Sequence, residues 1–258
     1  MTILYDSPVF GPVKSRRLGI SLGINLLPAD GKCCTFDCLY CECGLNRDYV
    51  PHSRFPSREQ VRQALEAKLL EMQQKGELPD VLTFAGNGEP TLNPAFPEVV
   101  DDVVELRNKL CPEAKVSVLS NATMILQPRV FEALKKVDNN ILKLDTVDHL
   151  YIEKVCRPVE EFYDEQMLIR RMAAFEGHCI VQTMFMRGHY NGEDVSNLDD
   201  EYVVPWIEAL KEIGPEQVMI YTIDRETPIE TLEKASKQDL DSVAERVRYA
   251  GLKCSVSY

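Results

Sequence analysis

The sequence predicts an α/β protein whose parallel strands form a partial (β/α)6 barrel. Two observations predict this fold class. Short runs rich in β-branched residues alternate with longer stretches of helical periodicity along the 258 residues, and this alternation is typical of a parallel sheet with right-handed crossovers. Polar or otherwise unusual residues recur at the carboxyl ends of the predicted strands, where parallel barrels have their active sites. A chain of this length suits one large domain, so we expect residues 1–258 to form a single domain.

Short apolar segments are predicted as strands. Each is too short for its periodicity to distinguish a strand from a buried helix, so its position between predicted helices decides the assignment. The seven segments are residues 18–26, 81–85, 116–119, 141–144, 180–185, 217–221 and 252–255. A cysteine-rich loop, residues 34–41, follows the first of them.

The helices are predicted from apolar residues that recur at helical spacing. Ser57 and Gln60 form a capping box at the start of the first helix, and Ser236 is a suitable N-cap for the last. Gly177 and Gly214 are expected to end two others. The apolar stripes are Val61, Leu65, Leu69 and Met72; Val99, Val103, Leu106 and Leu110; Val130, Phe131 and Leu134; Leu168, Met172 and Phe175; Trp206, Leu210 and Ile213; and Leu240, Val243 and Val247.

Composition and charge narrow the class of protein. The formal net charge is −12, and 45% of the residues are hydrophobic. Nucleic-acid-binding proteins normally carry an excess of Lys and Arg for phosphate contacts, so this acidity disfavours a polynucleotide substrate. No apolar stretch is long enough to cross a bilayer, and the start of the chain lacks the pattern of a signal peptide. We therefore expect a cytoplasmic protein that does not contact a membrane.

Nine cysteines are present, and five of them lie between Cys33 and Cys43. An odd, clustered set does not resemble a secreted disulfide framework, and it favours a reducing compartment with metal ligation. The other four are isolated in the sequence and are expected to be small buried apolar residues. They are Cys111, Cys156, Cys179 and Cys254.

The cysteine loop contains a C-x3-C-x2-C run formed by Cys34, Cys38 and Cys41. Three thiolates this close together can bind three irons of one 4Fe–4S cube, a cluster that normally takes four cysteines. One iron then keeps an open coordination position, as catalytic metal sites do. Cys33 would give a C-x4-C spacing, so Cys34 is the better ligand. Cys43 is either a spare thiol or a ligand that repairs or modifies the cluster.

A structural zinc site is the main alternative for this loop. Zinc in such sites takes four ligands, usually from two paired knuckles. The sequence has no second C-x2-C or H-x3-H pair downstream of the loop, and its four histidines are scattered. The cysteine spacing therefore favours an iron–sulfur cluster over zinc.

A glycine-rich turn follows the second predicted strand and consists of Gly86, Asn87, Gly88 and Glu89. The two glycines let the backbone approach a ligand closely, and Glu89 adds a carboxylate. A G-x-G-E pattern alone is most often a simple turn. Directly after a strand, and downstream of the cysteine loop, it indicates a cofactor-binding segment.

Four further polar residues lie in or after later strands. Ser120 and Asn121 can either bind a ligand or cap a turn. Asp145 ends an apolar run, so its carboxylate needs a partner if it is buried, whereas Lys143 is expected on the opposite face of the strand. Gln182 lies within a strand, where its amide can serve a ligand or the core.

Arginines form another set of candidates. Arg16 and Arg17 precede the first predicted strand, and paired guanidinium groups bind carboxylate or phosphate well. An ordinary surface salt bridge is an equally good interpretation for the remaining candidates for substrate contact. These are Arg157, Arg187, Tyr221 and Arg225.

With these motifs, the chain resembles the radical S-adenosylmethionine (SAM) superfamily. The resemblance implies a 4Fe–4S cluster whose open iron binds the amino and carboxylate groups of SAM. One electron, from a donor such as flavodoxin or ferredoxin, then cleaves SAM to methionine and a 5′-deoxyadenosyl radical that abstracts hydrogen from a substrate. It also implies that Tyr40 packs near the adenine, that the turn at residues 86–89 contacts the methionine amino group, and that Ser120, Asn121, Asp145 and Gln182 are candidates for the remaining SAM contacts.

A narrower resemblance rests on four segments: G-P-V-x-S-R-R-L-G, I-N-L-L-P, G-x-G-E-P-T-L and residues 221–225. Together they resemble small iron–sulfur oxidoreductases related to wyosine-forming tRNA-modification enzymes. The chain lacks the second cysteine triad that holds an auxiliary cluster in the wyosine-forming enzymes. The leading expectation is therefore a small-molecule or protein substrate, with tRNA as the alternative. A non-enzymatic electron carrier or zinc-stabilised adaptor is the alternative from a different class.

Overall fold

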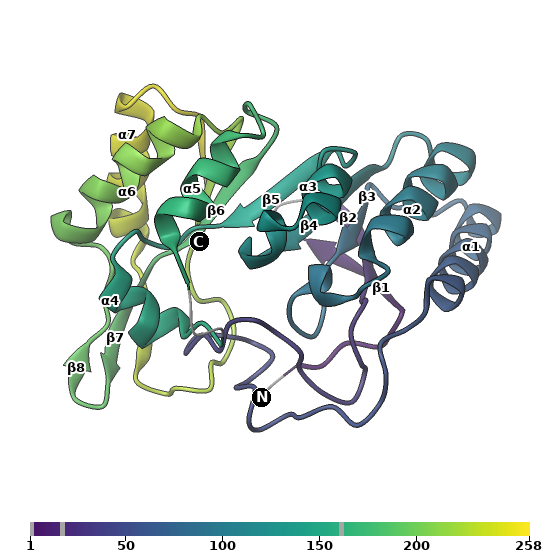
Figure 1. The fold of residues 1–258 in the computed structure, drawn as a ribbon, viewed down its shortest axis with the longest axis horizontal. Coiled ribbons are helices and arrows are strands. Elements are labelled where there is room, and N and C mark those ends of the chain that lie inside the picture. The colour runs from purple at the N-terminus through teal and green to yellow at the C-terminus, as the bar shows by residue number, and fades with distance from the viewer. Residues whose placement is uncertain (1–2, 16–18, 160–162) are drawn as a thin grey trace.

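A computed structural model describes residues 3–15, 19–159 and 163–258 (Figure 1). Its main element is an eight-stranded sheet. In spatial order the strands are β1 (Val9–Ser15), β2 (Gly19–Ile24), β3 (Val81–Phe84), β4 (Lys115–Ser120), β5 (Asn139–Lys143), β6 (Ile180–Met184), β9 (Gln217–Tyr221) and β11 (Cys254–Ser257). All neighbouring pairs are parallel except β1 and β2. The sheet is open, with β1 and β11 at its edges, so the predicted α/β fold with a partial parallel barrel is confirmed.

Helices cover the outer side of this sheet (Figure 1). They are α1 (Arg58–Lys75), α2 (Phe96–Leu110), α3 (Pro128–Leu134), α5 (Glu165–Ala173), α6 (Asp200–Ile213) and α7 (Lys237–Tyr249). The capping box of Ser57 and Gln60, the N-cap Ser236 and the C-cap Gly214 are confirmed. The expectation that Gly177 ends a helix is wrong, because α5 ends at Ala173.

The end of α5 has a packing reason. Its C-cap is Ala174, and Phe175, predicted within the helix, lies beyond it and stacks on Phe131 with ring centroids 4.1 Å apart.

The last predicted strand also shifts by two residues. The Leu252 N–H donates to the carbonyl of Val247 in α7, so Leu252 completes the helix end and the strand begins at Cys254.

The hydrophobic core lies between the sheet and the helices. Phe84 of β3 packs edge-on against Phe96 of α2, with ring centroids 5.6 Å apart. Trp206 of α6 is buried, and its indole N–H donates to the Leu144 carbonyl at 3.0 Å. Aromatic side chains of this size contribute much of the buried apolar area of a core. They fix the helices on the sheet and thereby the level at which each strand ends.

Several small elements were not predicted. A three-stranded sheet has the order β10 (Leu232–Lys234), β7 (Met186–Tyr190) and β8 (Glu193–Asp194). Short helical segments are η1 (Pro90–Leu92), η2 (Thr123–Leu126), α4 (His149–Tyr151) and the π-helix η3 (Ile152–Cys156). These elements are two to five residues long, which is too short for hydrophobic periodicity to reveal them. β1 was also missed, since its segment resembled a loop motif.

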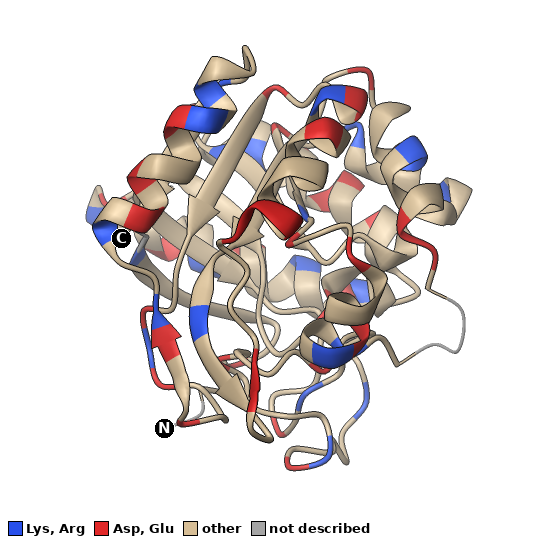
Figure 2. Cartoon of the chain, turned by 90° about the vertical axis from the view of Figure 1, so that its left-hand side faces the viewer, with Lys and Arg blue, Asp and Glu red and all other residues tan. Residues whose placement is uncertain are grey.

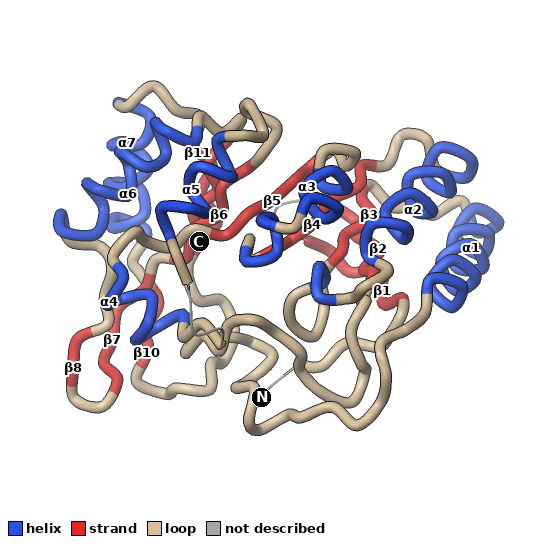
Figure 3. Tube along the Cα trace, viewed as in Figure 1, coloured by secondary structure: helices blue, strands red, loops and turns tan. Residues whose placement is uncertain are grey.

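The strand register brings the unusual residues to one edge. Ile24, Phe84 and Val118 are paired across β2, β3 and β4, and Lys143 pairs with Gln182 across β5 and β6. Long loop segments gather along one side of the sheet, at the bottom of Figure 3. In the described part of the chain, no helix is long and apolar enough to cross a membrane.

Candidate active site at the carboxyl ends of the strands

The cysteine loop is joined to the glycine-rich turn through backbone contacts. The Cys33 N–H donates to the Asn87 carbonyl at 2.9 Å, and the Glu89 N–H donates to the Cys33 carbonyl at 3.0 Å. Gly88 has a φ of +131°, and a Cβ there would lie 1.9 Å from the Cys33 carbonyl oxygen. Glycine is therefore required because two loops meet at this point. The turn holds the cysteine loop at the end of β3.

The Asn87 side chain is hydrogen-bonded within the protein, whereas the family resemblance implied that the turn containing it contacts a ligand. Its side chain is fully buried, and its amide donates to the carbonyls of Tyr5 and Pro28 at 3.0 and 2.8 Å. Its oxygen accepts from the Tyr5 N–H at 2.8 Å. The Asn87 amide thus binds the N-terminal segment to the back of the turn.

The three motif thiols lie in one loop beside nitrogen donors. Cys38 is buried, and Cys34 and Cys41 are half-buried. The amide nitrogen of Asn121 lies 3.5 Å from the Cys34 sulfur, and the ammonium of Lys143 lies 3.7 Å from the Cys38 sulfur. N–H donors of this kind stabilise thiolate ligands. The donor set fits an iron–sulfur cluster, which takes thiolates.

Each thiol has its own protonation environment. Burial raises the pKa of Cys34. A hydrogen bond with Cys43, assisted by the charge of Lys32, lowers the pKa of Cys41 to about 6. A hydrogen bond with Cys156, assisted by Lys143, lowers the pKa of Cys38. For Cys38 and Cys41 the pKa is thus shifted in the direction that favours the thiolate, the form that binds metal.

Lys32 was not recognised from the sequence, although it stands directly before the cysteines. Its side chain is completely buried. The ammonium donates to the Gly44 carbonyl at 2.7 Å and lies 3.8 Å from Asp37. Burial disfavours its charge, but the nearby thiols of Cys41, Cys34 and Cys38 raise its pKa. A buried ammonium inside this loop offsets the negative charge that thiolates bring.

The two neighbouring cysteines, Cys33 and Cys43, lie beside the motif. The Cys43 thiol is buried and donates to the Gly86 carbonyl at 3.4 Å. Cys33 contributes its backbone to the contact with Gly88. Across the three described ranges, no three His, Cys, Asp or Glu side chains are placed to hold a single metal ion.

Glu89 connects the glycine-rich turn to β4. One carboxylate oxygen accepts from the N–H and hydroxyl of Thr91 at 3.1 and 2.6 Å. The other accepts from the Asn121 N–H at 2.6 Å. Burial raises the pKa of Glu89, and these hydrogen bonds oppose that shift. The carboxylate therefore fixes the position of Asn121 next to the cysteine loop.

Ser120 and Asn121 both form local turns, and Asn121 also reaches the cysteine loop. The Ser120 hydroxyl accepts from the Ala122 N–H at 3.0 Å, and the Asn121 oxygen accepts from the Thr123 N–H at 3.1 Å. The Asn121 amide then donates to the Thr35 hydroxyl at 2.8 Å. Ala122 has a φ of +69°, which is strained for a residue with a Cβ. Such strain is typical of functional loops.

Asp145 is the centre of a buried network. Its Oδ2 accepts from the Tyr40 hydroxyl and lies 3.2 Å from the Lys143 ammonium. Its Oδ1 accepts from the Met184 N–H at 3.0 Å. The carboxylate thus has the partners that its burial requires. Burial, together with the Asp145 charge, raises the pKa of Tyr40.

The expectation that Lys143 faces away from this network is wrong. Residues two apart in an extended segment share a face, so Lys143 and Asp145 point the same way. Cys156, isolated in the sequence, also joins the network: its thiol lies 3.3 Å from the Lys143 nitrogen and 3.7 Å from Asp145. It ends the π-helix η3, an element that is frequent at functional sites. Gln182 is half-buried and pairs with Lys143 across the sheet.

The arginine candidates separate into two groups. Arg157 lies 2.8 Å from Asp37 of the cysteine loop, and Arg225 lies 2.7 Å from Glu42 of the same loop. Arg187 instead pairs with Asp239 at 2.8 Å, at the start of α7. Tyr221 ends β9 opposite Met184 of β6. Arg16 and Arg17 lie outside the described residues.

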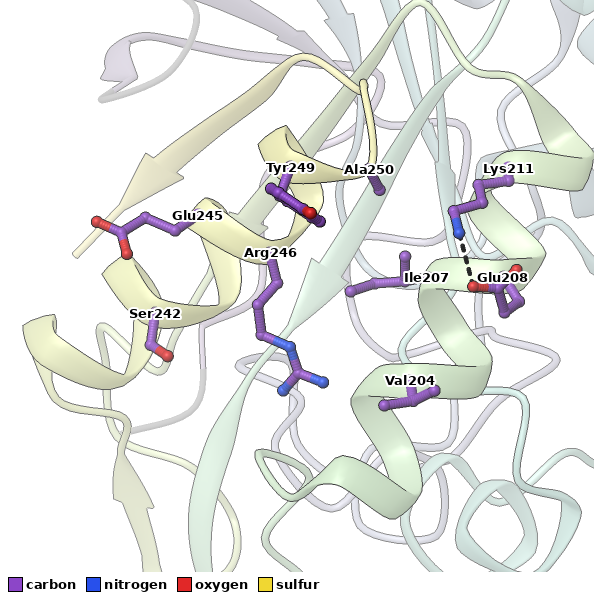
Figure 4. A pocket seen from close by; sticks show the side chains of 9 residues that line it. All are labelled: Val204, Ile207, Glu208, Lys211, Ser242, Glu245, Arg246, Tyr249 and Ala250. Carbon is purple, nitrogen blue, oxygen red and sulfur yellow. Dashed lines mark hydrogen bonds and ion pairs between the residues drawn. The ribbon is translucent and has the colours of Figure 1, made fainter.

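Two cavities in the described part of the chain lie away from the three motif cysteines. A pocket of about 710 Å³ lies between α6 and α7 (Figure 4), and none of the predicted site residues lines it. A second, of about 370 Å³, includes Arg157, Lys154 and Tyr190 beside η3. In the view of Figure 2, acidic and basic residues are interspersed along the helices. Arg157, which pairs with Asp37 of the cysteine loop, connects that loop to the second cavity.

Comparisons with known proteins agree with this geometry. A family model described as "Radical SAM superfamily" matches residues 30–201. A UPF0026 protein of Helicobacter pylori (strain ATCC 700392 / 26695) is 29% identical over 252 residues, which cover 97% of this chain and 73% of that protein.

Two solved structures show the same fold. A radical SAM methyltransferase from Sphaerobacter thermophilus has a TM-score of 0.66 and 13% sequence identity, and the match covers 92% of this chain and 66% of that one. TYW1 with a lysine–pyruvate adduct bound has a TM-score of 0.63 and 14% identity, covering 89% of this chain and 73% of that one. Because the family model spans most of the chain, including the cysteine loop and the strand ends around it, the chain belongs to the radical SAM superfamily, whose members are enzymes that use a 4Fe–4S cluster and SAM.

Proposed function

We propose that Cys34, Cys38 and Cys41 bind a 4Fe–4S cluster whose open iron binds SAM. When bound, these groups supply reductive cleavage of SAM to methionine and a 5′-deoxyadenosyl radical, which abstracts hydrogen from a small-molecule or protein substrate. The observation that carries this proposal is the meeting of the cysteine run with the glycine-rich turn at one edge of a parallel sheet. The direct hydrogen bonds between Cys33 and that turn support it.

The surrounding residues have distinct roles in this proposal. Gly86, Gly88 and Glu89 shape the backbone that faces the methionine part of SAM, while Asn87 secures the turn from behind. Asn121 presents its amide next to Cys34, and Ser120 precedes it in the chain, which supports a role for the two residues in binding the SAM carboxylate or ribose. Buried polar groups that are oriented in advance by hydrogen bonds bind ligands with little reorganisation.

Asp145, Tyr40 and Gln182 form the opposite side of the proposed SAM site. Both carboxylate oxygens of Asp145 are engaged within the protein, so we assign it the role of orienting the Tyr40 ring. The half-buried Gln182 is the side chain here that can reach the adenine or ribose. It pairs across the sheet with Lys143, which contacts Cys38.

Arg157 and Arg225 are the substrate candidates that ion pairs place beside the cysteine loop, and Tyr221 packs against the hydrophobic cluster that contains Cys38 and Tyr40. Arg157 and Arg225 each pair with an acidic residue of that loop, so a substrate anion would compete with Asp37 or Glu42. The sheet that continues from β1 to β11 supports a single domain. A one-electron donor, such as flavodoxin or ferredoxin, is the protein partner that this chemistry requires.

A tRNA substrate is the second candidate, favoured by the segments that resemble wyosine-forming enzymes. The net charge of −12 opposes it, because phosphate contacts need cations. Binding of total tRNA, measured at increasing salt concentrations, separates the candidates. Affinity that falls steeply as salt rises supports tRNA, whereas no binding at low salt supports the leading proposal.

The test of the main proposal is anaerobic turnover. The protein is reconstituted with iron and sulfide, reduced with dithionite and mixed with SAM, and 5′-deoxyadenosine is measured. We expect product from the wild type and from Cys111→Ala, a buried cysteine at the other end of the sheet. Cys34→Ala should lose both the iron and the product. A protein that purifies with zinc, or that carries a cluster with four side-chain ligands, would overturn the proposal.

A further inference from the structure

Lys143 is the last residue of β5 and has an unusual set of neighbours. Its side chain is mostly buried, and its ammonium lies 3.2 Å from Asp145. The same nitrogen lies 3.7 Å from the Cys38 sulfur, 3.3 Å from the Cys156 sulfur and 4.4 Å above the Phe36 ring. A cation in such surroundings is held in one place by its contacts. It is therefore a fixed charge beside one proposed cluster ligand.

We propose that Lys143 is a positioning residue that raises the reduction potential of the cluster through a charge-assisted hydrogen bond to the Cys38 thiolate. This inference rests on the proposed function, because it needs the cluster at Cys38. Reduction adds one electron, and hence negative charge, to the iron and its sulfur ligands. A hydrogen bond to a ligand sulfur stabilises that charge, and such bonds are among the factors that set cluster potentials.

Asp145 orients the ammonium without cancelling its effect. The Asp145 carboxylate also accepts hydrogen bonds from Tyr40 and from the Met184 N–H, which spread its charge. The Lys143 nitrogen lies 3.2 Å from the Asp145 carboxylate and 3.7 Å from the Cys38 sulfur. Its positive charge is therefore close to the Cys38 sulfur. At short range in a buried site, an interaction of this kind is only weakly screened.

The other two motif thiols have different partners, so the effect is assigned to one ligand. Asn121, a neutral donor, approaches Cys34, and Lys32 stabilises the Cys41 thiolate from within the loop. Lys32 also donates to the Gly44 carbonyl, so its substitution would alter the loop as well as the charge. Lys143 belongs to strand β5, so its replacement removes the charge while the strand stays in place. It is the cleaner position for an experiment.

The test is a redox titration of the reconstituted protein without SAM, followed by electron paramagnetic resonance. We compare the wild type with Lys143→Met, Lys143→Arg and the double variant Lys143→Met/Asp145→Asn. Lys143→Met should move the potential to a more negative value, and the double variant should move it less, because no unpaired carboxylate is left. Lys143→Arg should stay near the wild type. Lys115→Met, at the amino end of β4 and beside Asp138, is the matched control and should not move it.

The outcomes separate this inference from the proposed function. If the wild type and Lys143→Met both bind iron and show equal potentials, the inference is overturned while the proposed function stands. If the wild type cannot assemble a cluster that depends on Cys34, the proposed function itself fails. Loss of iron from both variants without the ammonium, with retention in Lys143→Arg, would assign Lys143 a structural role and would also overturn the inference.

Discussion

The two ends of the parallel strands have the same backbone architecture and very different chemistry. At the amino ends, the carboxylate of Asp138 lies near the surface: it accepts from the Val116 N–H at 2.8 Å and from Arg107 at 2.7 Å, with about a quarter of its side chain exposed. At the carboxyl ends, Glu89 and Asp145 are 2% and 5% exposed. Of these three carboxylates, the two at the carboxyl ends are buried, whereas Asp138 is partly exposed.

This difference indicates which end of the strands carries the functional site. Burial of a polar group costs free energy unless hydrogen bonds compensate for the lost water. At the carboxyl end, hydrogen-bond partners around Glu89 and Asp145 offset that cost, whereas Asp138 at the amino end keeps part of its contact with water. Buried ionisable groups with shifted pKa values cluster at functional sites. Matched substitutions at the two ends test whether the carboxyl end is specialised in this way.

The largest difference is expected between Gly88→Ala and Gly76→Ala. A Cβ at Gly88 would collide with the Cys33 carbonyl, whereas Gly76, the C-cap of α1 before β3, has no atom within 4 Å of that position. Gly76→Ala should cost about 1 kcal/mol, because alanine is strained at its positive φ. Gly88→Ala should cost more and separate the cysteine loop from the turn. Iron content and thermal unfolding measure this. Retention of iron by Gly88→Ala would show that the contact is dispensable.

The second comparison is between Glu89→Gln and Asp138→Asn. The NH2 group of the glutamine must face the N–H of either Thr91 or Asn121, which bond to different oxygens of Glu89, so we expect a loss of about 1–3 kcal/mol in the free energy of unfolding. Asp138→Asn should cost about 1 kcal/mol, since the group is partly solvated. Denaturant unfolding of the cluster-free protein measures both. Equal losses would contradict the specialisation of the carboxyl end.

The pH dependence of these two variants should have opposite signs. Burial raises the pKa of Glu89 above 4.5, so its favourable contribution is complete below that value and is lost as pH rises through the folded-state pKa. Burial acts on Asp138 too, but hydrogen bonds from Val116 and Arg107 lower its pKa below 3.8. Its contribution is therefore present above 3.8 and is lost as pH falls. The Glu89→Gln loss should shrink with rising pH while the Asp138→Asn loss grows.

The smallest effect is expected from alanine-to-glycine changes at the two ends. Ala122, after β4, has a positive φ, so glycine relieves strain of about 1 kcal/mol while losing a buried methyl of similar value. We expect a net change within about 0.5 kcal/mol. Ala114, before β4, is also buried but has no such strain, and glycine should cost about 1–2 kcal/mol there. A larger loss at Ala122 than at Ala114 would argue against stored strain beside Asn121.

The order of strands and helices could be read from the sequence because it depends on local properties. Apolar residues at helical spacing predicted all of the longer helices, and buried β-branched runs predicted the seven parallel strands. Two local motifs indicated the chemistry: the spacing of Cys34, Cys38 and Cys41, and the position of Gly86 to Glu89 after a strand. Residues that are neighbours in sequence lie close together whatever the rest of the fold. The three-stranded sheet and the short helical segments were missed because they lack a hydrophobic period and do not belong to the alternation of strands and long helices.

Only the tertiary structure decided which isolated residues meet the cysteine loop. Cys156 and Lys143 are far from Cys38 in sequence, and their contacts arise because η3 and the end of β5 converge on the loop. The same packing turned Asn87 toward the N-terminal segment and gave Asp145 its partners. A local pattern determines which backbone form a segment adopts and which chemistry it carries, but the distance between residues of different segments is set by long-range packing of the sheet, which no short stretch of sequence contains.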